Sequence, residues 1–138
     1  MPINIYLSFA GECREAVTFY AKVFRVTVPE MMRYGDRPSE GFTITAEQQD
    51  YVLHTSLTIL GTEVMFSDTL PSPDFVKGTN FALTLITDDK DEITRIYTEL
   101  GEGGEVDMPL EKTFFSEWFG MVTDRFGISW QLSHAAGA

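Results

Sequence analysis

The chain has little of the chemistry that builds disulfides and metal sites. It contains one cysteine, Cys13, and two histidines, His54 and His134, among its 138 residues. A lone cysteine cannot form an internal disulfide, which is typical of proteins kept in a reducing compartment. We therefore expect a cytoplasmic protein. The scarcity of imidazole also argues against a divalent metal site, because such sites draw mainly on His, Cys and carboxylate ligands.

Basic residues are scarce as well. Lys and Arg number 10 against 21 Asp and Glu, giving a formal net charge of −11 at pH 7. A surface of this sign repels phosphate backbones and anionic lipids, so we expect neither nucleic acid nor a membrane as partner. No uncharged run is long enough to span a bilayer, and the N-terminus lacks the basic region of a signal peptide.

Large apolar side chains are plentiful. Hydrophobic residues make up 43 % of the chain and include 11 Phe and 2 Trp. That content favours a folded core over disorder. The length suits one domain spanning residues 1–138.

A β-hairpin pattern occurs twice, at residues 54–67 and 118–132. In the second, the turn Asp124-Arg-Phe-Gly127 starts with an Asp that can cap its own backbone and ends with a Gly that accepts positive φ. Superposing Gly61 on Gly127 aligns Val64 with Trp130, Met65 with Gln131, Phe66 with Leu132 and Ser67 with Ser133. The alignment indicates that one structural unit is repeated.

The segments before each hairpin repeat in the same order. Residues 3–9 and 81–86 alternate as strands do, and residues 12–24 and 88–100 carry apolar stripes at helical spacing. Irregular strands follow at 26–33 and 102–115. We predict an α+β fold of two βαβββ modules, about 1–68 and 81–134, joined by a connector at 69–80. Their strands would form a curved eight-stranded mixed sheet, a cup, with both helices on its outer face.

Three stretches carry a family resemblance: YLSF…CREAVTFYAKVF, HTSLTILGTEVMFSD and WFGMVTDRFGISWQL. They resemble the PhnB-like branch of the vicinal-oxygen-chelate (glyoxalase/bleomycin resistance/dioxygenase) superfamily, often labelled 3-demethylubiquinone-9 3-methyltransferase-like. The resemblance implies paired βαβββ modules, a homodimer and a small-molecule site in the cup, which in many superfamily enzymes holds a divalent metal. No glycine-rich methyl-donor site accompanies these stretches, so methyl transfer is not the activity we expect.

Strand alternation identifies the side chains that face the cup. If Val64, Phe66, Trp130 and Leu132 lie beneath the helices, their neighbours along each strand point the other way. Aligning Gly120 with His54 adds Trp118 and Val122 to the cup face. The predicted ligand-binding residues are Tyr6, His54, Ser56, Met65, Thr84, Trp118 and Gln131.

The same positions test for a metal. The resemblance implies ligands from the first, fourth, fifth and eighth strands. This chain has Asn4 or Tyr6, Met65, Ala82 or Thr84, and Gln131 there. None is a divalent ligand of the imidazole or carboxylate type, so we expect no metal ligands and no cofactor.

His54 is the candidate catalytic residue, because an imidazole can exchange a proton near neutral pH. A strand histidine satisfied by a neighbouring hydroxyl or carbonyl is the alternative. Cys13 is either a reactive thiol at a helix start or a half-buried small residue. Trp118 is either a stacking platform for a planar ligand or part of a dimer contact. Asp68 is expected to cap a turn rather than bind a ligand.

Three functions fit these observations. The first is a small-molecule-binding protein that holds its ligand in the cup without a metal. The second is an enzyme of the lyase, isomerase or dioxygenase-like kind, acting on a small carbonyl or oxygenated compound through His54 or an unexpected metal site. The third is a dimeric partner of another protein. The absence of the family's metal ligands favours the first.

Overall fold

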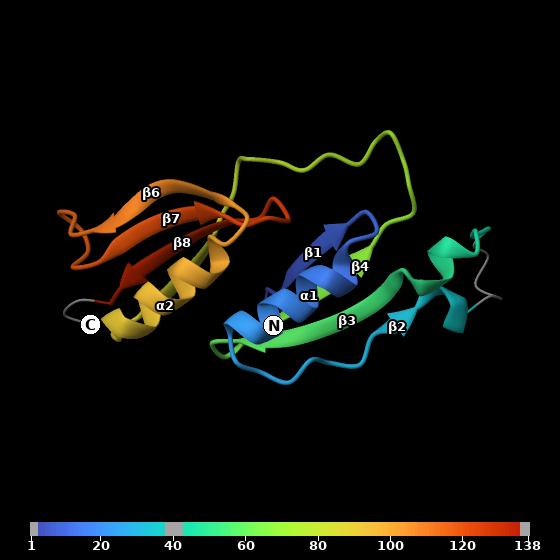
Figure 1. Ribbon diagram of the computed structural model, residues 1–138, viewed down its shortest axis with the longest axis horizontal. Coiled ribbons are helices and arrows are strands. Elements are labelled where there is room, and N and C mark those ends of the chain that lie inside the picture. The colour runs from blue at the N-terminus through green and yellow to red at the C-terminus, as the bar shows by residue number, and fades with distance from the viewer. Residues whose placement is uncertain (1–2, 38–42, 136–138) are drawn as a thin grey trace. The chain divides into compact units, whose positions relative to one another are not determined.

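A computed structural model describes residues 3–37 and 43–135. The chain forms two compact units, Met1–Val76 and Lys77–Ala138, whose boundary falls in the predicted connector (Figure 1). Each unit contains one βαβββ module, and the two are described separately below. In the part of the chain that the structure describes, no helix is long and apolar enough to cross a membrane.

The first module is a four-stranded mixed sheet with one helix. Its sheet order is β1-β4-β3-β2, with β1 parallel to β4 and the other neighbours antiparallel. The elements are β1 (Ile5–Phe9), α1 (Cys13–Val23), β2 (Met32–Arg33), β3 (Val52–Ile59) and β4 (Thr62–Asp68), with the short 3-10 helices η1 (Tyr34–Asp36) and η2 (Glu47–Asp50) between β2 and β3.

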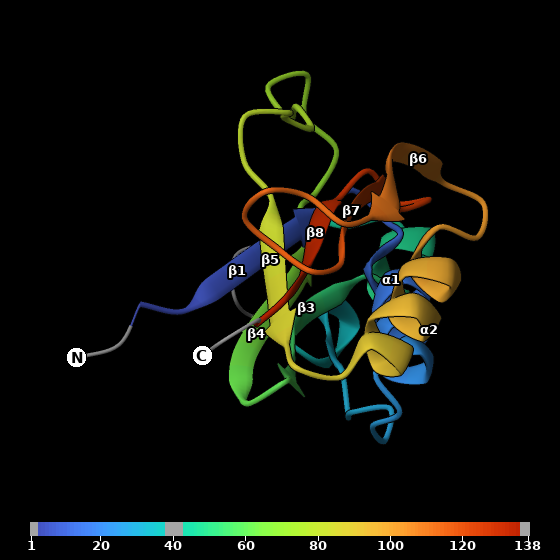
Figure 2. The same ribbon diagram turned by 90° about the vertical axis from the view of Figure 1, so that its left-hand side faces the viewer.

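The second module repeats this topology. Its sheet order is β5-β8-β7-β6, and Figure 2 shows parallel β5 and β8 side by side. The elements are β5 (Leu83–Thr87), α2 (Lys90–Leu100), β6 (Glu105–Glu111), β7 (Phe119–Thr123) and β8 (Ser129–His134).

The predicted α+β class and the pair of βαβββ modules are confirmed. The eight strands found among residues 3–37 and 43–135 are hydrogen-bonded as two sets of four, one in each unit. The single domain over residues 1–138 and the joining of both sheets into one cup stay predictions. The irregular strand expected at 26–33 is reduced to β2, while that at 102–115 is β6.

Each helix covers one face of its own sheet. On α1 the buried residues are Cys13, Ala16, Val17, Tyr20, Ala21 and Val23, and on α2 they are Ile93, Ile96 and Leu100. The helices pack on β3 and β4 and on β7 and β8, respectively. Val64, Phe66, Trp130 and Leu132 are all buried, as strand alternation predicted. The opposite face of each sheet therefore carries the candidate ligand-binding side chains of its own strands β1, β3 and β4 or β5 and β8.

A buried carboxylate, Asp68, closes the first module at the end of β4. Its Oδ1 accepts hydrogen bonds from the backbone N–H groups of Gly11 at 2.7 Å and Cys13 at 3.0 Å. Its Oδ2 accepts from the N–H of Val52 at 2.9 Å. The N-cap residue of α1, Glu12, makes no side-chain cap bond. Asp68 thus caps a helix from a distant strand and also fixes the start of β3.

The two hairpins differ in their loops, and this overturns one face assignment. Ile59 pairs with Thr62 across residues 60–61, where Leu60 (φ 47°) and Gly61 (φ 85°) form a tight turn. Thr123 pairs with Ser129 across the longer loop 124–128. Superposing the two glycines therefore misaligns β3 and β7 by one residue.

A one-residue slip reverses every side chain. The expectation that Trp118, Gly120 and Val122 share the face of His54 is wrong. Val122 pairs with Trp130 and is fully buried, and Gly120 lies against Tyr97 of α2. Met121, the partner of Gln131, faces away from the helix.

Replacing Asp68 with Asn should weaken the first module. An amide has one acceptor oxygen, so a backbone N–H group that now meets a carboxylate oxygen would meet an NH₂ group instead. We expect Asp68→Asn to lower the free energy of unfolding by roughly 2 kcal/mol, measured by urea denaturation. Asp74→Asn, on the exposed connector, is the matched control and should change it little. Equal stability of the two variants would contradict the role given to Asp68.

Candidate functional site

The exposed face of the first sheet brings together four of the predicted ligand-binding residues. Met65 of β4 pairs with Tyr6 of β1 on one side and with Ser56 of β3 on the other, so the three form a row across the sheet. His54 lies two residues before Ser56 on the same face. The rings of Tyr6 and His54 are 6.0 Å apart between centroids and inclined at 40°. Tyr6 is 48 % exposed and His54 is exposed as well.

His54 also borders a pocket at the β2 edge of this sheet. The pocket is open, has a volume of about 470 Å³ and is lined by Glu30, Met31, Met32, Asp36, Arg37 and His54. Met32 and His54 are cross-strand partners in the β2–β3 pair. The Oγ1 of Thr55 donates to the backbone oxygen of Glu30 at 2.8 Å, which holds the segment before β2 against β3. The pocket combines thioethers, an imidazole and charges of both signs.

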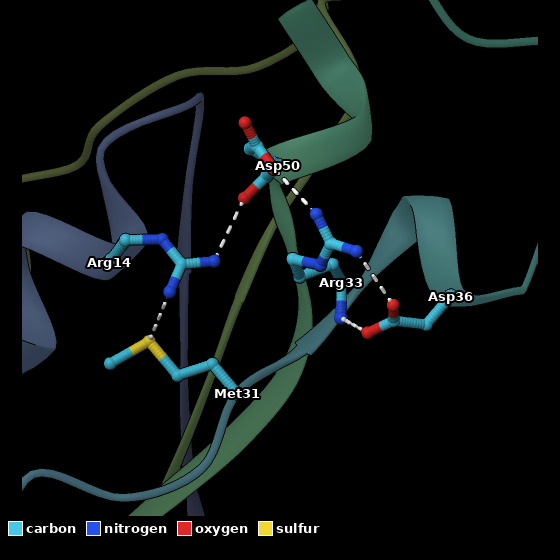
Figure 3. A network of polar contacts seen from close by, with 5 residues as sticks. All are labelled: Arg14, Met31, Arg33, Asp36 and Asp50. Carbon is cyan, nitrogen blue, oxygen red and sulfur yellow. Dashed lines mark hydrogen bonds and ion pairs between the residues drawn. The ribbon is translucent and has the colours of Figure 1, made fainter.

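A polar network anchors the wall of this pocket (Figure 3). Arg33 donates from Nη1 to Asp50 Oδ1 at 2.7 Å and from Nη2 to Asp36 Oδ1 at 3.0 Å. Arg14 of α1 donates to the backbone oxygen of Asp50 at 3.1 Å and contacts Met31 Sδ at 3.8 Å. Residues 31–36 are thereby tied to α1 and to η2.

The network also fixes charge at the pocket. The pKa of Asp36 is lowered most by a hydrogen bond from the backbone N–H of Arg33 and next by one from the Arg33 guanidinium. Asp36 therefore stays ionised and paired at neutral pH. Tyr34, which follows β2, donates from its hydroxyl to the backbone oxygen of Asp68 at 2.7 Å, and burial raises the pKa of this hydroxyl. Asp68 thus holds the pocket wall through Tyr34 and the strand of His54 through Val52.

The second module presents a different set on its own exposed face. Thr84 of β5 and Gln131 of β8 are register partners, and Thr84 Oγ1 donates to Gln131 Oε1 at 3.2 Å. Gln131 pairs in turn with Met121 of β7. Thr84 and Gln131 can donate and accept hydrogen bonds, but neither is an acid or base.

Trp118 lies away from the Thr84 and Gln131 pair of its own module. Its Nε1 donates to Thr94 Oγ1 of α2 at 3.0 Å, so the indole is placed on the helix side of its module. The sequence predicted that Trp118 lies on the same face as Thr84 and Gln131, and the structure does not bring them together. Its part in ligand binding stays a prediction.

Other candidates have structural roles. Cys13 is fully buried. Burial is the main cause that raises the pKa of its thiol, and the nearby Asp68 carboxylate is the second. The reading of Cys13 as a reactive thiol activated by the helix dipole is not supported. Asp68 caps a helix start rather than a turn. Asp89 is the N-cap of α2, with its Oδ1 accepting from the N–H of Glu92 at 3.1 Å.

The positions that the superfamily uses for a divalent metal do not fit one here. The positions implied by the resemblance hold Asn4 or Tyr6, Met65, Ala82 or Thr84, and Gln131, and none of these offers an imidazole or a carboxylate. Divalent ions such as Zn²⁺ and Mn²⁺ bind imidazole, thiolate and carboxylate far better. Among residues 3–37 and 43–135, no group of three or more His, Cys, Asp or Glu is placed to hold a metal ion.

Comparison with known proteins agrees with this architecture. The family model described as 3-demethylubiquinone-9 3-methyltransferase matches residues 2–133. The chain belongs to this family. It is 29 % identical over 140 residues to Protein YjdN of Escherichia coli (strain K12), covering 96 % of this chain and 95 % of that protein.

Several solved structures are similar to this chain. Protein PA1353 from Pseudomonas aeruginosa is 34 % identical, with a TM-score of 0.80 and 97 % of each chain covered. A putative 3-demethylubiquinone-9 3-methyltransferase, PhnB protein, from Bacillus cereus is 29 % identical, with a TM-score of 0.81, covering 98 % of this chain and 100 % of that one. The fosfomycin resistance protein FosX from Listeria monocytogenes shares the fold, at 12 % identity and a TM-score of 0.62. The chain is a PhnB-like domain of the vicinal-oxygen-chelate superfamily.

Sequence reasoning missed most of the pocket. Glu30, Asp36 and Arg37 were not singled out, because they lie in an irregular segment with no periodicity to orient them. The paired Met31-Met32 was a visible signal, an apolar cluster beside a charged loop. Only the register of β2 against β3 places Met32 beside His54.

Proposed function

We propose that this protein binds a small organic molecule on the exposed sheet face of its first module, in the pocket bordered by His54. The observation that carries the proposal is the position of His54. It joins the row of Tyr6, Met65 and Ser56 to a pocket of about 470 Å³. That volume lies within the range of small-molecule sites.

The side chains suit a compact ligand with an apolar body and a polar end. Tyr6, Met32 and Met65 offer aromatic and thioether surface, which adapts to planar or irregular shapes. His54 can donate or accept a hydrogen bond, and Glu30 and Arg37 offer charges of opposite sign at the rim. The family and the fold neighbours suggest a small-molecule-binding protein, which supports this assignment.

We propose that binding needs no divalent metal or other cofactor, because the ligand positions implied by the resemblance hold Asn4 or Tyr6, Met65, Ala82 or Thr84, and Gln131. Nor do we propose methyl transfer. The links after β1 and β5, residues 10–12 and 88–89, contain a single glycine, Gly11, and form no glycine-rich loop for a methyl donor.

Ligand screening on metal-stripped protein tests the proposal. A library of small carbonyl compounds and aromatic acids would be screened by saturation-transfer NMR, with elemental mass spectrometry verifying that metal is absent. Hits should shift the imidazole signal of His54, and His54→Ala should weaken their binding at least tenfold. His134→Asn is the matched control, since the chain has only these two histidines. Hits that bind His54→Ala as tightly as the wild type would refute the assignment.

Acid–base catalysis at His54 is the second candidate. Its supporting observation is that the Glu30 carboxylate and the His54 imidazole line the same pocket. Such a pair could remove a proton next to a carbonyl and return it, as an isomerase or lyase requires.

Exchange of hydrogen for deuterium tests this chemistry directly. Carbonyl compounds that bind would be incubated with the protein in D₂O and followed by proton NMR. The wild-type protein and His134→Asn should both catalyse the loss of an α-proton signal, and His54→Ala should not. This pattern would establish the chemistry. Binding without exchange would mean that the protein binds these compounds and does not catalyse this proton transfer.

We also propose a cytoplasmic homodimer. The lone, reduced Cys13 supports the location. Large exposed hydrophobic residues support a contact with another chain, among them Ile86 at 63 %, Val106 at 59 % and Phe115 at 57 % exposure. Light scattering at micromolar concentration should give twice the 15.6 kDa of one chain. A particle of 15.6 kDa would rule the dimer out.

A further inference from the structure

The first module gathers methionine sulfur around its one histidine. Met32 and His54 are partners in the antiparallel β2–β3 pair, and both line the pocket. Directly opposed residues project from the same face with Cβ atoms about 4.5–5.5 Å apart. Met32 is 39 % exposed and His54 is exposed, so both side chains are accessible to an ion from solution.

A second sulfur lies on the same face. Met65 pairs with Ser56, which is two residues from His54, so Met65 is the diagonal neighbour of the imidazole. Diagonal neighbours are about 7–8 Å apart, within reach of long side chains. The flexible thioether of Met65 can therefore turn toward His54. The Tyr6 ring, 6.0 Å from that of His54, borders the same place and offers a π face to a cation.

Met31 differs from these two methionines. Its Sδ lies 3.8 Å from Arg14 Nη1, on the side of α1, as Figure 3 shows. A guanidinium beside the sulfur opposes a bound cation there. Met31 is therefore not part of the set, although it lines the same pocket.

We propose that His54, Met32 and Met65 form a binding site for a soft monovalent metal ion, Cu(I) or Ag(I). Thioether sulfur selects such ions, and imidazole completes the set as a borderline donor. None of the three proposed ligands is a carboxylate or a thiolate. Glu30 and Asp36 line the same pocket, but they do not form a group of metal-binding residues with His54, so hard and divalent ions are disfavoured. The net charge of −11 favours the approach of a cation. The site does not depend on the organic ligand proposed above, although both would use His54.

Titration of the wild-type protein with Ag(I) tests the site without a redox step. The protein would carry ¹³C-labelled methionine methyl groups, and silver nitrate would be added in chloride-free buffer. One equivalent should shift the methyl signals of Met32 and Met65 and the ring signals of His54. The signals of Met31, Met108 and Met121 should stay in place. Zn(II) should produce no comparable shift.

Matched variants measure the contribution of each ligand. Met32→Leu and His54→Gln should each lower the Ag(I) affinity at least tenfold, and Met65→Leu should lower it as well. Leucine nearly conserves the volume of methionine, so folding should be preserved. Met31→Leu is the control from the same pocket and should stay within twofold of the wild type.

Several results would overturn the site. They are the lack of saturable Ag(I) binding, wild-type affinity in Met32→Leu and His54→Gln, and equally tight binding of Zn(II). A response confined to the buried thiol of Cys13 would do the same, because thiolate is the stronger soft ligand. The methyl signals separate this last case from the proposed one in the unmodified chain.

Discussion

The buried carboxylate of Asp68 is the interaction on which the first module depends. It receives N–H groups from the loop before α1, from the first residue of α1 and from the start of β3, while its own backbone oxygen receives the Tyr34 hydroxyl. A charged group 2 % exposed is stable only with such partners. Because the same bonds hold Val52 and Tyr34, Asp68 also positions His54 and the segment that lines the pocket.

The second module fills the equivalent position differently. Phe9 pairs with Asp68 in the first sheet, and Thr87 pairs with His134 in the second. His134 Nε2 lies 3.0 Å from the backbone oxygen of Asp88, so an imidazole ties the strand to the link before α2. The helix there is capped locally by Asp89. The two modules therefore share one layout, but the backbone N–H groups at their helix starts are bonded by different side chains. The first module alone presents an imidazole on its exposed face.

The prediction of this fold from sequence succeeded where periodicity was strong and local. The stripes of α1 and α2 and the alternation in β3, β4 and β8 identified the buried faces, because burial on one side forces a period of 3.6 or 2. The same reasoning grouped Tyr6, His54, Ser56 and Met65 correctly. It failed at β7, because the loop between Thr123 and Ser129 has five residues and the loop between Ile59 and Thr62 has two. Superposing the loop glycines therefore misaligned the strands by one residue and reversed the faces of Trp118 and Val122. A glycine at a turn marks positive φ, yet it does not fix how many residues the loop contains.

The sequence alone determined the two βαβββ modules, their order, and the polar-neutral character of the faces opposite the helices, because these follow from patterns within single elements. The pocket was decided only by the tertiary structure. Glu30, Met32 and Arg37 reach His54 through the pairing of the two-residue strand β2 with β3 and through the bonds of Arg33 and Tyr34. So short a strand has no period of its own. Its position is set by partners distant in sequence, including Asp68 at the C-terminal end of β4, whose backbone oxygen accepts a hydrogen bond from the Tyr34 hydroxyl.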